Sequence, residues 1–188
     1  MNGLNTSTTK ADLPIIYRDD DPCVFTCAGD FKRMHEEVFV KTKTLHTAAI
    51  VVDDLWRNTA LFYYLITAPY LKVELHAWDH DPKNDFSNMD IDDVFYTLQK
   101  CLKYYYTNAM RMLGVQKLPP EKCITTWFTP WNRATDNMIK SCEAMQLKFC
   151  NVAYGEWNGN FIKSLHCWNW VRIPEGEPIT LEKMLDRI

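Results

Sequence analysis

Glycine is scarce in this chain of 188 residues, which has six in total and no glycine-rich loop. A P-loop or a dinucleotide-binding turn needs several glycines at fixed spacing, so the sequence excludes these phosphate-binding motifs. It also has no G-x-S-x-G motif, and none of its seven cysteines has a convincing catalytic partner. Serine and cysteine hydrolases are therefore poor interpretations.

Excess charge of one sign is also missing. The chain has 21 basic and 24 acidic side chains, which gives a formal net charge of -3. General nucleic-acid binding needs a basic surface, so we expect no nucleic acid among the partners.

Long hydrophobic runs are absent as well. The longest, residues 61–71, is interrupted by Thr67 and Pro69 and is shorter than the roughly 20 residues that a membrane span needs. The first 13 residues are polar and lack the apolar core of a signal peptide. With no C-x-x-C pair either, we expect no membrane span, a cytoplasmic location, and cysteines that are reduced thiols, mostly buried.

Apolar residues, by contrast, are plentiful enough for a globular core, at 47% beside 24% charged residues. Proline and glycine are spread evenly, and no repeat or charged linker is visible, so a single domain over 1–188 is expected. Aromatic residues reach 13%, including seven tryptophans. They indicate either a large aromatic core or a cleft that stacks on flat ligands such as sugar rings.

Segments expected to be strands alternate with segments expected to be helices. The expected strands are 13–17, 47–52, 71–75, 124–128, 147–153 and 160–165. The expected helices are 30–40, 58–66, one that Ser87 opens and Gly114 ends, one capped by Thr135, and a last one capped by Thr180. This α/β alternation predicts a parallel sheet, either a barrel or doubly wound, with functional residues at the carboxyl ends of its strands.

Polar side chains follow four of the expected strands. In chain order they are the run Asp19–Asp21, the pair His76 and His80, the segment Thr129–Asn132, and His166. One carboxylate and two imidazoles suit a divalent transition metal with an open position for water. Alone, each feature has a plainer interpretation: an acidic loop is usually solvated, and two histidines four residues apart are often incidental. Their shared position at strand ends favours the metal site.

Two further features bear on this site. His166 lies close to Trp168 and Trp170, so a packed core histidine is its ordinary interpretation. Residues 79–85 resemble a calcium-binding loop in their acidity, but the positions that need an oxygen ligand and a glycine hold Lys83 and Asn84. A calcium loop is therefore excluded.

At these residues the chain resembles the polysaccharide deacetylases, the carbohydrate esterases of family 4 (CE4) with the NodB homology domain. The family's TFDDGP-like, HTWSH-like and RPPYG-like motifs and its final Leu-His are matched, in that order, by Tyr17–Pro22, His76–His80, Phe128–Asn132 and Leu165–His166. The resemblance extends from about Pro14 to Trp170. It implies a distorted (β/α) barrel with fewer than eight units.

The resemblance also implies a role for each matched residue. Asp19 would be the general base, and His166 the general acid. The metal ligands would be Asp20, His76 and His80. The metal would be zinc by default, with cobalt, manganese, nickel or iron also possible.

On the substrate side, the backbone N–H near Trp131 would help to bind the oxyanion, and Trp131 and Trp168 would stack on a sugar. The implied activity is metal-dependent hydrolysis of an amide, which removes an acetyl or similar acyl group from an amino sugar or a small N-acyl compound.

The chain departs from the family at three positions. Asp21 replaces the glycine of the first motif, and Phe128 replaces the arginine that orients the base. Arg133, or else Arg18, is expected to supply the missing cation beside Asp19.

No aspartate occurs between Asp136 and Asp186 to match the one that tunes the acid histidine, and Glu156 is the nearest candidate. The alternative to an enzyme is therefore a catalytically degenerate deacetylase fold that binds a glycan or a protein.

Overall fold

The computed structural model describes residues 15–22, 28–150, 154–157 and 160–166. Its strands are β1 (Ile15–Asp20), β2 (His46–Val51), β3 (Leu71–Ala77), β4 (Thr126–Phe128), β5 (Lys148–Cys150), β6 (Tyr154–Trp157) and β7 (Asn160–His166). The helices are α1 (Ala28–Met34), α2 (Val52–Leu55), α3 (Thr59–Thr67), α4 (Ile91–Leu113) and α5 (Asp136–Ala144). A π-helical turn, His35–Val40, continues α1.

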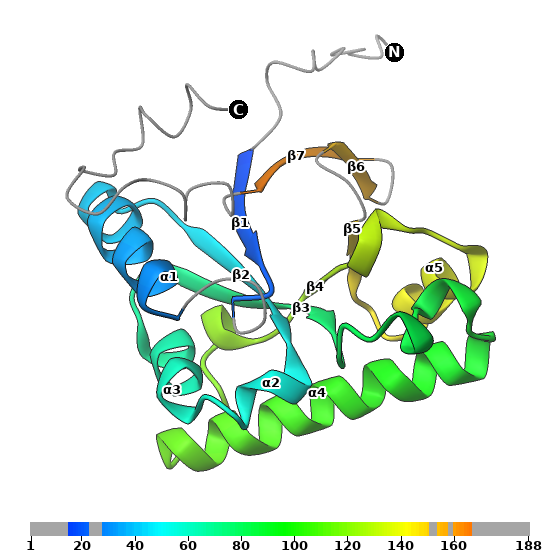
Figure 1. Cartoon of the computed structure of the whole chain (residues 1–188), viewed down its shortest axis with the longest axis horizontal. Coiled ribbons are helices and arrows are strands. Elements are labelled where there is room, and N and C mark those ends of the chain that lie inside the picture. The colour runs from blue at the N-terminus through cyan, green and yellow to red at the C-terminus, as the bar shows by residue number, and fades with distance from the viewer. Residues whose placement is uncertain (1–14, 23–27, 151–153, 158–159, 167–188) are drawn as a thin grey trace, which may run out of the picture.

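The strands form one curled sheet in the order β5-β4-β3-β2-β1-β7-β6. Every neighbouring pair is parallel except β6 with β7. The helices lie around the outside of the curl, and β6 comes beside β5, so the sheet is a partial barrel (Figure 1). This confirms the expected distorted (β/α) barrel with fewer than eight units.

Alternation along the strands separates a helix-covered outer face from an inner face. On β3, Val73 and Leu75 belong to the main hydrophobic core, whereas Glu74 and His76 point to the other side. On β4, Trp127 lies in that core, and Phe128 belongs to a separate small cluster with Ala49 and Cys150. The inner face is therefore where buried polar groups collect.

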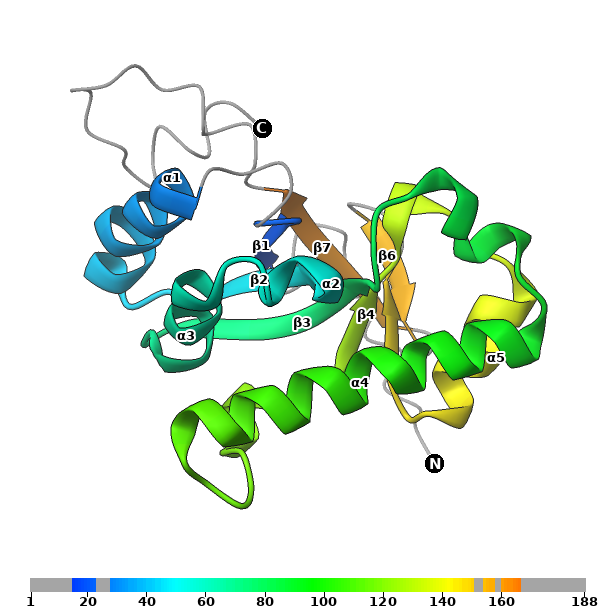
Figure 2. The ribbon, with the colours of Figure 1, turned by 60° about the horizontal axis from the view of Figure 1, so that its bottom comes forward.

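The long helix α4 covers the outside of β3 and β4 (Figure 2). The expected apolar period is confirmed by its buried residues, Val94, Leu98, Cys101, Tyr105 and Ala109. Gly114 ends it in the left-handed conformation, φ 65°, as the sequence predicts.

The start of α4 differs from expectation. Its N-cap is Asp90, whose carboxylate accepts the Asp93 N–H at 2.9 Å, while Ser87 lies in a short 3-10 turn.

The other expectations concern further helices and strands, the cysteines and membrane spans. Thr135 caps α5 as predicted. Strand β6 and helix α2 were not anticipated, and the helix expected after Thr180 lies outside the described residues. Three of the four described cysteines are buried and none forms a disulfide. In the described part of the chain, no helix combines the length and apolarity needed to cross a membrane.

Candidate metal centre

His76 is fixed near the end of β3 by two hydrogen bonds to β4. Its Nδ1 donates to the Phe128 carbonyl at 2.7 Å, and the Trp127 indole donates to the His76 carbonyl at 2.8 Å. Because Phe128 offers only an acceptor, Nδ1 carries the proton and Nε2 keeps its lone pair. Orientation of a ligating imidazole by such a hydrogen bond is typical of metal sites.

The Nε2 of His76 faces the side chains of Asp21 and His80. Asp21 places Oδ1 at 3.4 Å from His76 Nε2 and Oδ2 at 3.4 Å from His80 Nε2, and the two imidazole nitrogens are 3.4 Å apart. Ligand atoms of all three residues lie within 4.8 Å of one another. One carboxylate and two imidazoles at this separation are a donor set that suits zinc and other divalent transition metals.

The electrostatics of this trio favour a cation. Burial, and then the negative charges of Asp20, Asp19 and Asp54, raise the pKa of Asp21 to about 8, against the opposing effect of Arg18. Burial lowers the pKa of His76 to about 4 and also lowers that of His80. The imidazoles are thus neutral at pH 7, as metal ligands must be, and a divalent cation bound between them would favour the ionised form of Asp21.

The carboxylate beside the histidines is that of Asp21, whereas the family resemblance implies Asp20 as the ligand. The reason is the length of β1, which continues through Asp20 instead of ending at Tyr17. Asp21 follows with a positive φ of 55°, a conformation suited to the motif glycine it replaces and tolerated by aspartate. This turn directs its side chain to His76 and His80.

Asp19 lies on the wrong face for the base role that we expected. It shares a face with Tyr17, which packs against Phe39 in the main core, ring centroids 5.8 Å apart. Asp19 is fully buried, and neither carboxylate oxygen has a hydrogen-bond partner in the described structure. Burial and the neighbouring Asp20 raise the pKa of Asp19 well above its usual range.

The replacement cation is Arg18, and its partner is Asp20. Alternation puts these two residues on the same inner face, where Arg18 Nη2 lies 3.1 Å from Asp20 Oδ2. The Arg18 guanidinium also lies over the Phe128 ring, 4.8 Å from its centroid. Phe128 holds the place of the family arginine, so a cation does occupy this region, but it comes from β1.

Arg133, our first candidate for that cation, is wrong in this role. Its Nη1 donates to the carboxylate of Asp85 and to Ser87 Oγ, the latter at 3.3 Å. These contacts join Arg133 to the loop before α4, and no hydrogen bond or ion pair links it to Asp19 in the described residues. A role for Arg133 in substrate binding stays a prediction.

Trp131 stands beside the metal trio with its backbone in the left-handed region, φ 58°. The residue is 45% exposed, and its ring meets the His80 ring edge-to-face with centroids 4.2 Å apart. A bulky residue with positive φ is uncommon. The role of Trp131 in stacking on a sugar stays a prediction.

The remaining expected residues belong to β6 and β7 or lie outside the described residues. His166 is the last residue of β7, and its Cα pairs in register with that of Arg18. Glu156 is part of β6. Trp168 falls outside the described residues. Their roles in acid catalysis and substrate stacking stay predictions.

Comparison with known proteins gives matches at the level of structure alone. No family model and no curated protein matches the sequence. Among solved structures, a family 4 acetyl xylan esterase from Clostridium thermocellum in complex with a cobalt ion has a TM-score of 0.57 and 13% identity, over 92% of this chain and 90% of that one. The fold of this chain is therefore that of the CE4 esterases, as the motif resemblance predicts.

In two other similar structures, the match covers a smaller share of the solved protein. A family 4 carbohydrate esterase from Streptomyces lividans in complex with acetate has a TM-score of 0.55 and 9% identity, over 74% of this chain and 62% of that one. A CE4 pseudoenzyme from Bacillus anthracis has a TM-score of 0.56 and 15% identity, over 72% and 42%. The chain thus spans less than half the length of the Bacillus protein.

Proposed function

We propose that this protein is a metal-dependent deacetylase that removes an acetyl or similar acyl group from an amino sugar. The observation that carries the proposal is the trio Asp21, His76 and His80, which would hold the metal, next to a carboxylate that is paired with Arg18. A divalent metal held there would supply a Lewis acid that polarises the amide carbonyl and acidifies water. Zinc is the default occupant.

The proposed general base is Asp20, one residue later than the motif alignment implies. It is buried on the inner face, and the Arg18 guanidinium favours its ionised form and fixes its rotamer. An ionised carboxylate can take the proton of the attacking water. The one-residue shift of both acidic roles, Asp20 as base and Asp21 as ligand, follows from the extent of β1.

The other side of the reaction rests on Trp131 and His166. The backbone N–H of Trp131 would donate to the oxyanion that forms on the substrate carbonyl. His166 would give a proton to the leaving amine, which is a poor leaving group without it. The exposed Trp131 ring, with Trp168, would stack on the sugar.

The test is acetate release from N-acetylchitohexaose by the zinc-loaded protein. Asp20→Asn should keep metal content and lose turnover by roughly 100- to 10,000-fold, since the amide cannot accept a proton at neutral pH. Asp19→Asn is the matched control and should keep turnover. Equal turnover of Asp20→Asn and the parent would refute the assignment of the base.

A second candidate function is the binding of a glycan or a protein, without catalysis, by a fold of this type. The chain lacks the third-motif arginine, and the similar Bacillus anthracis protein is described as a pseudoenzyme, with a mutant whose enzymatic activity is restored. Saccharide binding by a metal-loaded parent that releases no acetate would favour this second function.

A further inference from the structure

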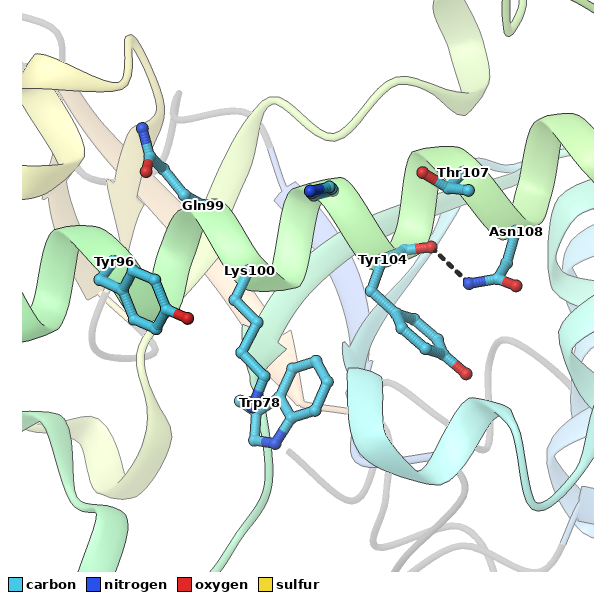
Figure 3. Close-up of a pocket in the computed structure, with 8 residues that line it drawn as sticks. Trp78, Tyr96, Gln99, Lys100, Tyr104, Thr107 and Asn108 are labelled. Atoms are coloured by element: carbon cyan, nitrogen blue, oxygen red, sulfur yellow. Dashed lines mark hydrogen bonds between the residues drawn. The ribbon is translucent and has the colours of Figure 1, made fainter.

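A hollow of about 500 Å³ lies outside the metal centre, along the exposed side of α4. Its walls include three aromatic rings, two lysines and an amide, those of Trp78, Tyr96, Tyr104, Lys100, Lys103 and Asn108 (Figure 3). We call this hollow the α4 groove. Its volume falls in the range of small-molecule and cofactor sites, roughly 300–1,000 Å³.

Two of the aromatic rings of the α4 groove, those of Tyr96 and Tyr104, lie in a row on α4. Tyr96, Lys100 and Tyr104 are four residues apart and so share one face of α4, with a rise of about 12 Å from the first to the last. Trp78 meets Tyr104 edge-to-face at 5.8 Å, and Tyr96 is 67% exposed. Tyr96 is thus presented to solvent, whereas Trp78 and Tyr104 are partly buried against the core.

The two lysines add positive charge to the groove. The Lys100 ammonium lies over Trp78, 3.4 Å from the ring centroid. Neither Lys100 nor Lys103 forms an ion pair in that part of the chain, although the chain is acidic overall. The groove is therefore complementary to an anionic group.

The groove has a polarity along its length. A second hollow, about 190 Å³, shares Trp78, Tyr96 and Lys100 with it and extends to Asp79 and Asn84. The Asp79 carboxylate, which accepts a hydrogen bond from the Asn84 amide at 2.8 Å, lies at this end. An anionic ligand would accordingly place its acidic group toward Lys103, which lines the larger hollow and not the second.

We propose that the α4 groove binds a sugar segment that carries acidic groups, as a saccharide site separate from the metal centre. The proposal rests on the proposed function, because it takes the ligand class to be carbohydrate. Aromatic faces pack on the apolar faces of sugar rings, the tyrosine hydroxyls and the Asn108 amide pair with sugar hydroxyls, and the lysines pair with carboxylate or sulfate. Two lysines beside Asp79 are too little positive charge for a nucleic-acid strand.

The test uses a hyaluronan hexasaccharide, which alternates N-acetylated and acidic sugars, titrated into the protein by calorimetry. We expect binding that weakens as salt rises. Lys100→Gln/Lys103→Gln should weaken binding by about tenfold or more, and Tyr96→Ala should weaken it several-fold, since cation and ring contacts are lost. Lys41→Gln/Lys140→Gln, a double change of exposed lysines elsewhere, and Tyr63→Ala should leave binding unchanged.

Three comparisons can overturn the groove proposal. Equal loss in both lysine double variants would show that charge alone drives binding. Equal or tighter binding of the neutral N-acetylchitohexaose would refute the role of the acidic group. Equal or tighter binding of hexathymidylate or hexaglutamate would assign the groove to a nucleic acid or an acidic peptide.

Failure of the proposed function can be distinguished from failure of the groove proposal. His80→Ala removes a metal ligand and should abolish acetate release while leaving hyaluronan binding intact. A parent protein that binds hyaluronan at the groove but releases no acetate would refute the deacetylase and keep the groove proposal. Loss of hyaluronan binding in His80→Ala would overturn a separate site.

Discussion

Asp19, Asp20 and Asp21 are chemically identical neighbours whose surroundings differ at every position. Asp19 is buried on the helix-covered face, Asp20 pairs with Arg18 on the inner face, and Asp21 reaches two histidines from a positive-φ turn. Their roles therefore depend on where β1 ends. The sequence motif shows three adjacent carboxylates, but the face of the sheet that each one occupies depends on the strand register.

At this scale we predict that Asp21→Asn lowers zinc affinity by about 100-fold or more, because a metal ligand is lost. Asp19→Asn is the matched control and should keep zinc affinity, since its side chain is buried on the face opposite the trio. Calorimetric titration with zinc measures both. Unchanged affinity in Asp21→Asn, with loss in Asp19→Asn, would restore the original motif alignment.

At the scale of elements, Glu74 joins β3 to β4 and so supports both strands under the site. The two strands share only one paired position, Leu75 with Trp127. Glu74 accepts the backbone N–H groups of Thr125 and Thr126 at 2.6 and 2.7 Å, and Lys72 Nζ lies 2.8 Å from it. A buried carboxylate thus replaces ladder hydrogen bonds that the short β4 does not make.

We predict that Glu74→Gln destabilises the fold by about 2 kcal/mol. The amide oxygen can keep both backbone hydrogen bonds at the Oε2 position, but the amide NH2 then replaces Oε1 and faces the Lys72 ammonium, which loses its anionic partner. Urea unfolding measures the change, and Glu143→Gln on the exposed side of α5 should cost less than about 0.5 kcal/mol. A loss in Glu74→Gln no larger than in Glu143→Gln would contradict this account.

Sequence periodicity predicts those elements that local interactions determine. The face of α4, the Thr135 cap and the Gly114 stop all follow from neighbours within a turn or two. Phe128 could be seen as a missing arginine, but its replacement by Arg18 depends on two strands that meet only in the folded sheet. The Glu74 bonds to Thr125 and Thr126 span about 50 residues and leave no local pattern.

At the scale of the whole molecule, the parallel sheet gathers buried ionisable groups at more than one place. Away from the metal centre, His35 and His46 lie between α1, its π-helical continuation and β2. His35 Nε2 lies 2.9 Å from the Pro69 carbonyl and therefore donates to it. His35 Nδ1 is then an acceptor, and the His46 Nδ1–H donates to it at 3.2 Å.

This pair holds each ring in its neutral form. Burial lowers the pKa of His35, and the charge of Lys122 lowers it further. The hydrogen bond to the Pro69 carbonyl and the charge of Glu36 act in the opposite direction. Burial and then His35 lower the pKa of His46 well below the usual range. Phe31 and Phe39 stack on His46 and offer it no charge. A proton added to His35 Nδ1 would place its N–H against the Nδ1–H of His46 in a buried position.

The contribution of this pair to the stability of the fold is therefore lost in mild acid. Because both folded pKa values are depressed, these two residues bind more protons in the unfolded chain below about pH 6.5, and their contribution is full above that pH and lost as the pH falls. We predict that His46→Phe reduces the stability loss between pH 7.5 and pH 5.0 by about 2 kcal/mol, the upper bound for one such histidine over that window. Urea unfolding at the two pH values measures it, with Phe39→Leu as the control that disturbs the same cluster and keeps the parent pH dependence. If His46→Phe loses as much stability in acid as the parent, another group is responsible.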